Sequence, residues 1–283
     1  MISKQRCDSA LGTWTHCAWE PLPSDALAGL VERIWDFEGI LAFPREQAFP
    51  DGTLALVVQL DEPHRPVATL PTDPFPPICF DGLQTRTTTI EGPRTRCRVI
   101  GIVLRPLGAF ALLGTSLRDL TDRSTDLHAL LGSAARELAA RLHDARDGSE
   151  RVLRARVWTE ARVVRATRAD PLVVRVLEHI ERGAGNLAIT QLDDLAGRSR
   201  SRLCAAFADA IGLGPKRYAR IVRFRHALEL VTAGARSLGD VALRSGYYDQ
   251  AHMNAEFHEH AGLTPRSYQL ARRYPESTHL VAP

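Results

Sequence analysis

The sequence predicts an α+β protein, in which a β-rich N-terminal domain ending in a helical pair precedes an all-α C-terminal domain. The runs LALVVQL (54–60) and CRVIGIVLRP (97–106) are rich in Val, Ile and Leu, which is typical of strands. From Asp170 onward the apolar residues recur at helical spacing, and a stretch of sequence is repeated at an offset of 50 residues. We therefore expect two domains, residues 1–165 and residues 166–283.

The N-terminal domain is expected to change from strands to helices near Ser124. The segment 61–77 carries six prolines, so it must be a loop or a sheet edge. A leucine stripe then predicts one helix, a second helix is predicted over 147–164, and residues 165–170 are predicted to be a linker. The stripe could form a dimer interface or pack onto its own domain, and the sequence leaves both open. Its members are Leu127, Leu130, Leu131, Leu138 and Leu142.

Composition indicates a globular protein without a membrane segment. The chain has 283 residues, of which 45% are hydrophobic and 24% charged, and no apolar run approaches the ~20 residues of a membrane-spanning helix. The N-terminus has no long apolar stretch of the secretory kind. The five cysteines form no C-x-x-C pair, which argues against a disulfide framework or a zinc finger. We expect a cytoplasmic protein with no membrane partner.

The positive charge lies in the C-terminal part of the chain. Residues 1–169 hold 21 Lys+Arg and 21 Asp+Glu, whereas residues 170–283 hold 15 and 12 and so carry the whole net charge of +3. A basic block suits a polyanionic partner, but a solvated arginine-rich surface explains it equally well. Charge alone therefore does not identify a nucleic-acid-binding domain.

The repeat is a duplicated module with the parts of a helix-turn-helix. Residues 199–218 align without gaps with residues 249–268. The first helices are expected over 189–196 and 238–245, and the second helices follow the capping residues Ser199 and Asp249. The matched positions are Leu203 with Met253, Phe207 with Phe257, Pro215 with Pro265, Lys216 with Arg266, and Tyr218 with Tyr268.

A connecting helix is predicted over residues 215–231. One face of it is apolar, whereas Lys216, Arg220 and Arg223 are expected to be left largely to solvent or phosphate. Such a helix would hold the two modules at a fixed separation, so that they could meet two major-groove faces one helical turn (~34 Å) apart.

The stretch DVALRSGYYDQAHMNAEFHEHAGLTPRSY (240–268) closely resembles the signature of the AraC/XylS-type transcription regulator family. The resemblance covers about residues 170–272, and FPDGTLALVV and DGLQTR resemble the first half of a subgroup with a β-rich domain. It implies a cupin-like N-terminal domain that senses a small-molecule effector or forms a homodimer. It also implies a tandem helix-turn-helix domain that binds double-stranded promoter DNA and acts on RNA polymerase, without a cofactor.

The histidine-rich stretch QAHMNAEFHEHAG (250–262) raises the question of a metal site. His252 and His260 lie on one helix face but roughly 12 Å apart, so one zinc ion could hardly take both. Either histidine with Glu256 could still supply two ligands. The resemblance places Met253 and Phe257 inward and the polar residues outward. We therefore expect the cluster to face DNA or solvent, without a metal.

The DNA-contacting residues are predicted from their positions on the second helices. Arg200 could pair with guanine, and Gln250 and Asn254 with adenine; the alternative for each is a solvated helix residue. We expect the second unit to carry most base readout and the first to hold phosphate through its arginines. The candidates are Arg198, Arg200, Ser201, Arg202, Cys204, Lys216, Arg217, Arg220, Arg223, Tyr248, Gln250, Ala251, Asn254 and Arg266.

Three residues depart from the family pattern. Many relatives carry arginine where this chain has Ala205 and Ala255, and Asp193 stands where a small apolar residue is preferred. These departures sustain an alternative function: a small-molecule-binding or catalytic β domain whose helical partner has lost DNA binding.

The N-terminal half shows no pattern typical of an enzyme. Its histidines are not spaced for shared metal ligation, and no Ser/His/Asp or Cys/His constellation or glycine-rich phosphate loop occurs; the histidines are His16, His64, His128 and His143. Asp51 is predicted to be a turn residue. Four aromatic residues could line an apolar pocket or belong to the core: Trp35, Phe37, Phe43 and Phe49.

Overall fold

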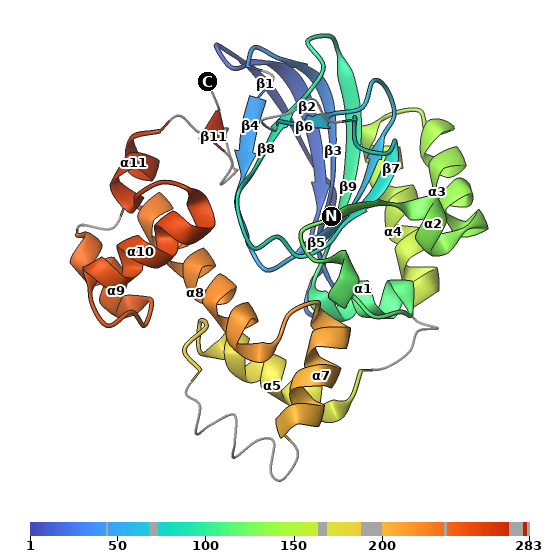
Figure 1. Ribbon diagram of the computed structural model, residues 1–283. Coiled ribbons are helices and arrows are strands. Elements are labelled where there is room, and N and C mark those ends of the chain that lie inside the picture. The colour runs from blue at the N-terminus through green and yellow to red at the C-terminus, as the bar shows by residue number, and fades with distance from the viewer. Residues whose placement is uncertain are drawn as a thin grey trace.

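The computed structural model describes residues 1–43, 45–67, 73–163, 169–187, 200–234, 237–271 and 280–281. Antiparallel sheets form the N-terminal part, and helices form the C-terminal part (Figure 1), which confirms the predicted fold class. One sheet has the order β1 (Ser3–Ser9), β2 (Gly12–Trp19), β3 (Val31–Leu41), β9 (Cys97–Leu104), β5 (Leu54–Gln59), β7 (Ile78–Asp81) and β10 (Ser124–Asp126). The other has the order β11 (Leu280–Val281), β4 (Arg45–Ala48), β8 (Thr88–Glu91) and β6 (Arg65–Pro66).

The two apolar runs are strands, as predicted, and the structure places them next to each other inside the larger sheet. Strands β5 and β9 pair antiparallel, with Leu54 opposite Leu104 and Gln59 opposite Val99. Nearly every residue of β9 is buried, and helices α1 (Pro106–Leu113) and α4 (Gly148–Val163) contact the strand. Part of the proline-rich segment forms β6, which lies at the end of the smaller sheet, where a missing N–H does least harm.

The four aromatic residues considered as a pocket have different surroundings. Trp35 lies over Gly101, where an added Cβ would stand 2.4 Å from the indole ring. Phe37 packs on Trp14, Phe43 is exposed, and Phe49 contacts the ring of Tyr268 edge-on at 5.5 Å between centroids. These side chains are packing residues, each in a different environment.

Helices cover one face of the larger sheet. The single helix predicted from the leucine stripe is divided into α2 (Leu127–Leu131) and α3 (Ser133–His143), because Gly132 has a positive φ of 55° between them. The second predicted helix is α4 (Gly148–Val163). The leucine stripe packs onto its own domain, since Leu127, Leu138 and Leu142 are buried there. Helix α1 (Pro106–Leu113) and the 3-10 turn η1 (Arg118–Leu120) were not predicted; α1 starts at the proline that ends β9.

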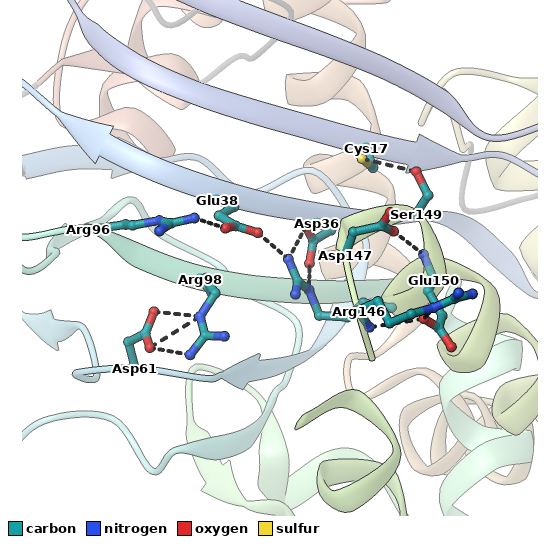
Figure 2. A network of polar contacts seen from close by, with 11 residues as sticks. Cys17, Asp36, Glu38, Asp61, Arg96, Arg98, Arg146, Asp147, Ser149 and Glu150 are labelled. Atoms are coloured by element: carbon teal, nitrogen blue, oxygen red, sulfur yellow. Dashed lines mark hydrogen bonds and ion pairs between the residues drawn. The ribbon is translucent and has the colours of Figure 1, made fainter. Parts of the chain in front are cut away.

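A buried arginine fixes α4 to the sheet (Figure 2). The Arg151 guanidinium donates to both carboxylate oxygens of Asp36 on β3, at 2.5 and 3.0 Å, and to Glu38 at 2.7 Å. Glu38 is also paired with Arg96 at the surface. Because Arg151 and Asp36 are almost completely buried, each charge depends on the other for compensation.

The C-terminal helices are α5 (Pro171–Arg182), α7 (Arg200–Ile211), α8 (Pro215–Thr232), α9 (Leu238–Arg244), α10 (Gln250–Ala261) and α11 (Pro265–Leu270). As predicted, Asp170 caps α5 by accepting from the Leu172 amide at 2.8 Å, and prolines occupy the first turns of α5, α8 and α11. Of the helices that the structure describes, none is long and apolar enough to cross a bilayer. The first helix expected for unit one (189–196), together with Ser199, Asp193 and Gly197, lies outside the described residues.

Two hydrophobic cores organise the chain. The first joins the sheet region to α5, α7 and the beginning of α8, and the second contains Phe49 with the rest of α8 and helices α9 to α11. Helix α8 therefore belongs to both cores. After α11, β11 pairs with β4 of the N-terminal region.

Candidate nucleic-acid interface

Helix α10 has the form of a recognition helix with a buried and an exposed side. Asp249 caps it by accepting from the His252 amide at 2.7 Å, as predicted. Met253 and Phe257 are fully buried, and the Phe257 ring lies 5.0 Å from that of Phe224 on α8. The exposed residues of its first turn include the predicted readers Gln250 and Ala251.

Asn254, the third predicted reader of this helix, is half-buried. Its side-chain oxygen is shielded from solvent and makes no hydrogen bond to the described residues. A bidentate contact with adenine uses both the oxygen and the nitrogen of the amide. Such a contact would therefore require the Asn254 side chain to rotate outward.

The expectation that the whole histidine and glutamate cluster faces outward is wrong. Glu256 and His260 are 6% and 5% exposed, whereas His252 and His258 are exposed. Helical periodicity explains this, because Met253, Glu256, Phe257 and His260 are spaced i, i+3, i+4 and i+7 and share the buried face. Among the residues that the structure describes, no three His, Cys, Asp or Glu side chains are grouped to hold a metal ion.

The prediction that Arg220 and Arg223 are left largely to solvent or phosphate is also wrong. Arg220 donates to Glu256 at 2.7 Å and pairs with Glu259; Arg223 donates to both oxygens of Glu256, at 2.9 and 3.1 Å. The Arg223 guanidinium also lies 5.0 Å from the ring centroid of Tyr247. Both arginines therefore link α8 to α10. Their contact with DNA stays a prediction.

These ion pairs keep Glu256 charged. Burial of the carboxyl opposes ionisation, but the hydrogen bonds from Arg223 and Arg220 outweigh it, so the pKa of Glu256 lies below its ordinary value. The burial of Glu256 could have been predicted from the sequence, because Glu256 shares a helical face with Met253 and Phe257. Its partners on α8 could not be predicted from residue spacing.

Helix α7 presents a different set of side chains. Leu203 and Phe207 are buried, and Arg200, Ser201 and Arg202 are exposed in the first turn, with Cys204 half-buried. Arg198 lies outside the described residues. The remaining candidates are exposed: Lys216 and Arg217 at the start of α8, Tyr248 before α10, and Arg266 in α11.

The N-terminal region holds the C-terminal ends of both helices, which sequence patterns did not reveal. The backbone amide of Leu117 donates to the Asp209 carbonyl at 2.8 Å, and Thr121 Oγ1 donates to the Gly212 carbonyl at 2.9 Å, at the end of α7. At the end of α10, the amide of Thr87 donates to the His260 carbonyl at 2.8 Å. Long-range contacts of this kind have no local sequence signature.

A third contact joins the turn before β5 to α5 and α8. Asp51 shapes this turn as predicted, by accepting from the amide and hydroxyl of Thr53 at 2.9 and 2.7 Å. Arg225 donates to the Asp51 carbonyl at 3.1 Å and to Glu181 at 2.6 Å, and the buried Tyr218 hydroxyl donates to Glu181 at 2.6 Å. These residues border a cavity between the N-terminal region and the helices.

Comparison with known proteins gives this helical region a family. Residues 193–271 match a family model described as a helix-turn-helix domain. A protein of Streptomyces lividans named as an AraC-like transcription regulator is 31% identical over 108 residues, which are 38% of this chain and 34% of that protein. The helical region is therefore similar to the helix-turn-helix domains of AraC-like transcription regulators.

Other matches cover different parts of the chain. The HTH-type transcriptional regulator YbfI of Bacillus subtilis is 34% identical over 73 residues, which are 26% of each chain. Residues 20–126 match a domain of unknown function, DUF6597. The chain spans between 14% and 35% of the length of the curated relatives that it matches.

Solved structures resemble this chain only loosely. The C-terminal domain of AraT from Geobacillus stearothermophilus superposes with a TM-score of 0.35 at 21% identity, covering 39% of this chain and 93% of its own. ToxT from Vibrio cholerae, solved with a bound unsaturated fatty acid, gives a TM-score of 0.40 at 14% identity, covering 84% and 93%. Both scores are low, so the similarity to AraC-like regulators depends on the sequence matches over the helical region.

Proposed function

We propose that the protein is a sequence-specific DNA-binding transcription regulator. Helix α10 carries the proposal: it is capped by Asp249, buries Met253 and Phe257, and leaves its first turn exposed for base edges. The family match over residues 193–271 and the names of the relatives support the same function. The protein would then act by binding rather than by catalysis.

The finer proposal is that two helix-turn-helix units occupy adjacent major grooves. We retain residues 1–165 and 166–283 as the two domains, with the first controlling the second and RNA polymerase, an effector and a second copy as further partners. The repeated sequence supports two units, and α8 connects them (Figure 1). The contacts of Leu117, Thr121 and Thr87 with the ends of α7 and α10 support control by the N-terminal domain.

Selection of bound duplexes from a random DNA pool at near-physiological salt tests this function. We expect an enriched motif with two elements about one helical turn (~34 Å) apart. The salt dependence of binding should be steep, because phosphate contacts release counterions. Weak, sequence-blind binding would contradict the proposal and favour the alternative, a ligand-binding or catalytic β domain with a helical partner that has lost specificity at Ala205 and Ala255.

Substitutions then separate the roles of the two units. We expect Asn254→Ala to relax base preference at its position at a cost of about 1–3 kcal/mol, whereas Arg200→Ala should weaken binding to all sequences. Equal loss of specificity in both variants would show that base readout is not concentrated in unit two.

A further inference from the structure

A cavity of about 890 Å³ lies where the N-terminal region meets α5 and α8. Its N-terminal walls come from the start of β3, from the turn 51–53 and from residues 103–107. Its volume lies within the ~300–1,000 Å³ typical of small-molecule sites. A molecule held there would contact both parts of the chain at once.

Helices α5 and α8 each line the cavity with residues from several consecutive turns. On α5 the lining residues Val174, Leu177, Glu178 and Glu181 are spaced i, i+3, i+4 and i+7, so they form one face. On α8 the lining runs from Tyr218 to Thr232. Apolar side chains occur on both sides of the space, where they could pack on a hydrocarbon body: Val103, Leu107, Val174, Leu177 and Leu228.

The charged lining has an excess of acid, although the chain as a whole carries +3. Five carboxylates and three arginines line the space: Glu32, Asp51, Glu178, Glu181 and Glu229, with Arg33, Arg105 and Arg225. Arg105 pairs with Glu32 at 2.8 Å, and Arg225 with Glu181 at 2.6 Å. The Glu178 side chain is exposed and makes no ion pair or hydrogen bond with any described residue. A concave wall with surplus carboxylates favours a cation.

We propose that this cavity binds a small organic cation, an amine or amidine with a short apolar body, with Glu178 as its charge partner. Glu181 lies three residues further along the same face of α5, within reach of the same ligand. The cation would compete with Arg225 for Glu181, and Arg225 also holds the Asp51 carbonyl. Binding would therefore alter the connection between α8 and the N-terminal region.

This connection gives the ligand a route to DNA binding, a consequence that rests on the proposed function. Helix α8 carries Tyr218 and Arg225 at the cavity and Arg220 and Arg223 at the contact with α10. A change in the position of α8 would alter the spacing of α7 and α10. Since both helices must fit the DNA together, ligand binding would change duplex affinity.

Calorimetric titration of the full-length chain with cadaverine, agmatine and phenethylamine, and separately with hexanoate and phenylacetate, tests the site. We expect an amine to bind saturably and the carboxylates not to bind. Glu178→Gln should weaken amine binding about tenfold, because the acceptor of the ammonium hydrogen bond loses its negative charge. Arg33→Ala should strengthen it by removing a like charge, and Glu160→Gln on α4, outside the cavity, should leave it unchanged.

Three results would overturn the site: no amine binds, a carboxylate binds more tightly, or Glu178→Gln and Glu160→Gln have equal effects. Circular dichroism establishes that each variant is folded. A separate duplex-binding assay distinguishes the two proposals. Amine binding without any duplex binding would refute the regulator and leave the site standing, whereas duplex binding without amine binding would refute the site alone.

Discussion

Helices α7 and α10 occupy equivalent places in the duplicated sequence, and their buried sides are nearly identical. The Phe207 and Tyr218 rings lie 6.1 Å apart at 60°, and the Phe257 and Tyr268 rings lie 6.1 Å apart at 64°. Leu203 and Met253 are buried at the preceding turn of each helix. The core positions of the module have therefore kept both residue type and geometry.

The polar side chains around this aromatic core have diverged between the two helices. Glu256, which pairs with two arginines of α8, corresponds to Ala206 in unit one. Glu259 pairs with Arg220 inside the helical region, whereas its counterpart Asp209 pairs with Arg118 of the N-terminal region at 3.3 Å. A duplicated module can thus retain one core while each copy adapts its surface to a different neighbour.

The largest effect should come from the shared core. Phe207→Ala and Phe257→Ala should each lower the free energy of unfolding by about 3–5 kcal/mol, because each leaves a cavity around a fully buried ring. Denaturant unfolding measures both. Tyr248→Ala, at an exposed ring, is the control and should change stability by less than about 0.5 kcal/mol. If one of the two phenylalanine variants lost much less stability than the other, the two cores would not be equivalent.

Glu256→Gln should destabilise unit two by about 1–3 kcal/mol, since Arg220 and Arg223 lose a charged acceptor. The pKa of Glu256 is lowered in the folded state, so its contribution is complete above the ordinary pKa of 4.5 and is lost as the pH falls through the folded value. Unfolding measured at neutral and acidic pH should show a smaller pH dependence in this variant than in Glu160→Gln. Identical pH profiles would mean that the ion pairs do not stabilise α10.

Removing the cap of α10 should have an intermediate effect. Asp249→Ala should cost about 1 kcal/mol, because the first-turn amides lose their acceptor, and Asp249→Asn should retain most of the stability. Asp170→Ala removes the corresponding cap of α5. If α10 reads DNA, only Asp249→Ala should also weaken duplex binding, as measured by fluorescence anisotropy. Equal duplex affinities in the two alanine variants would argue against α10 as the reader.

The smallest effects should come from the diverged ion pairs. Asp209→Ala and Glu259→Ala remove exposed carboxylates, so each should cost less than about 1 kcal/mol. Hydrogen exchange separates them, because the Leu117 amide donates to the Asp209 carbonyl. Exchange at Leu117 should accelerate in Asp209→Ala and not in Glu259→Ala. Faster exchange at Leu117 in Glu259→Ala and not in Asp209→Ala would contradict this assignment of the contact between α7 and the N-terminal region.

Local patterns predicted the elements whose causes are local. The runs at 54–60 and 97–106 are strands because branched apolar residues favour that state, and Asp170 and Asp249 cap helices as their positions indicate. The orientation of Met253 and Phe257 follows from helical spacing. Helix α1 escaped prediction, because its residues are apolar on all sides and continue a strand-like run.

Features that depend on distant neighbours could not be predicted. Arg223 and Glu256 are buried because their charges meet across two helices, and a surface location was the natural expectation for each alone. The acidic cavity likewise requires α5, α8 and the turn at 51–53 to be placed together. The exposed first turns of α7 and α10 agree with the predicted reader positions, but their DNA contacts stay predictions.

The sharing of α8 between two cores has a consequence for exchange of parts between regulators. Its 18 residues extend about 27 Å, with Tyr218 in the first core and Val231 in the second. A chimeric protein whose junction lies inside α8, or that receives α8 with only one unit, would lose part of the other hydrophobic core. A segment exchanged with another protein must therefore keep α8 whole, with α5, α7 and the sheet region on one side of it and α9 to α11 on the other.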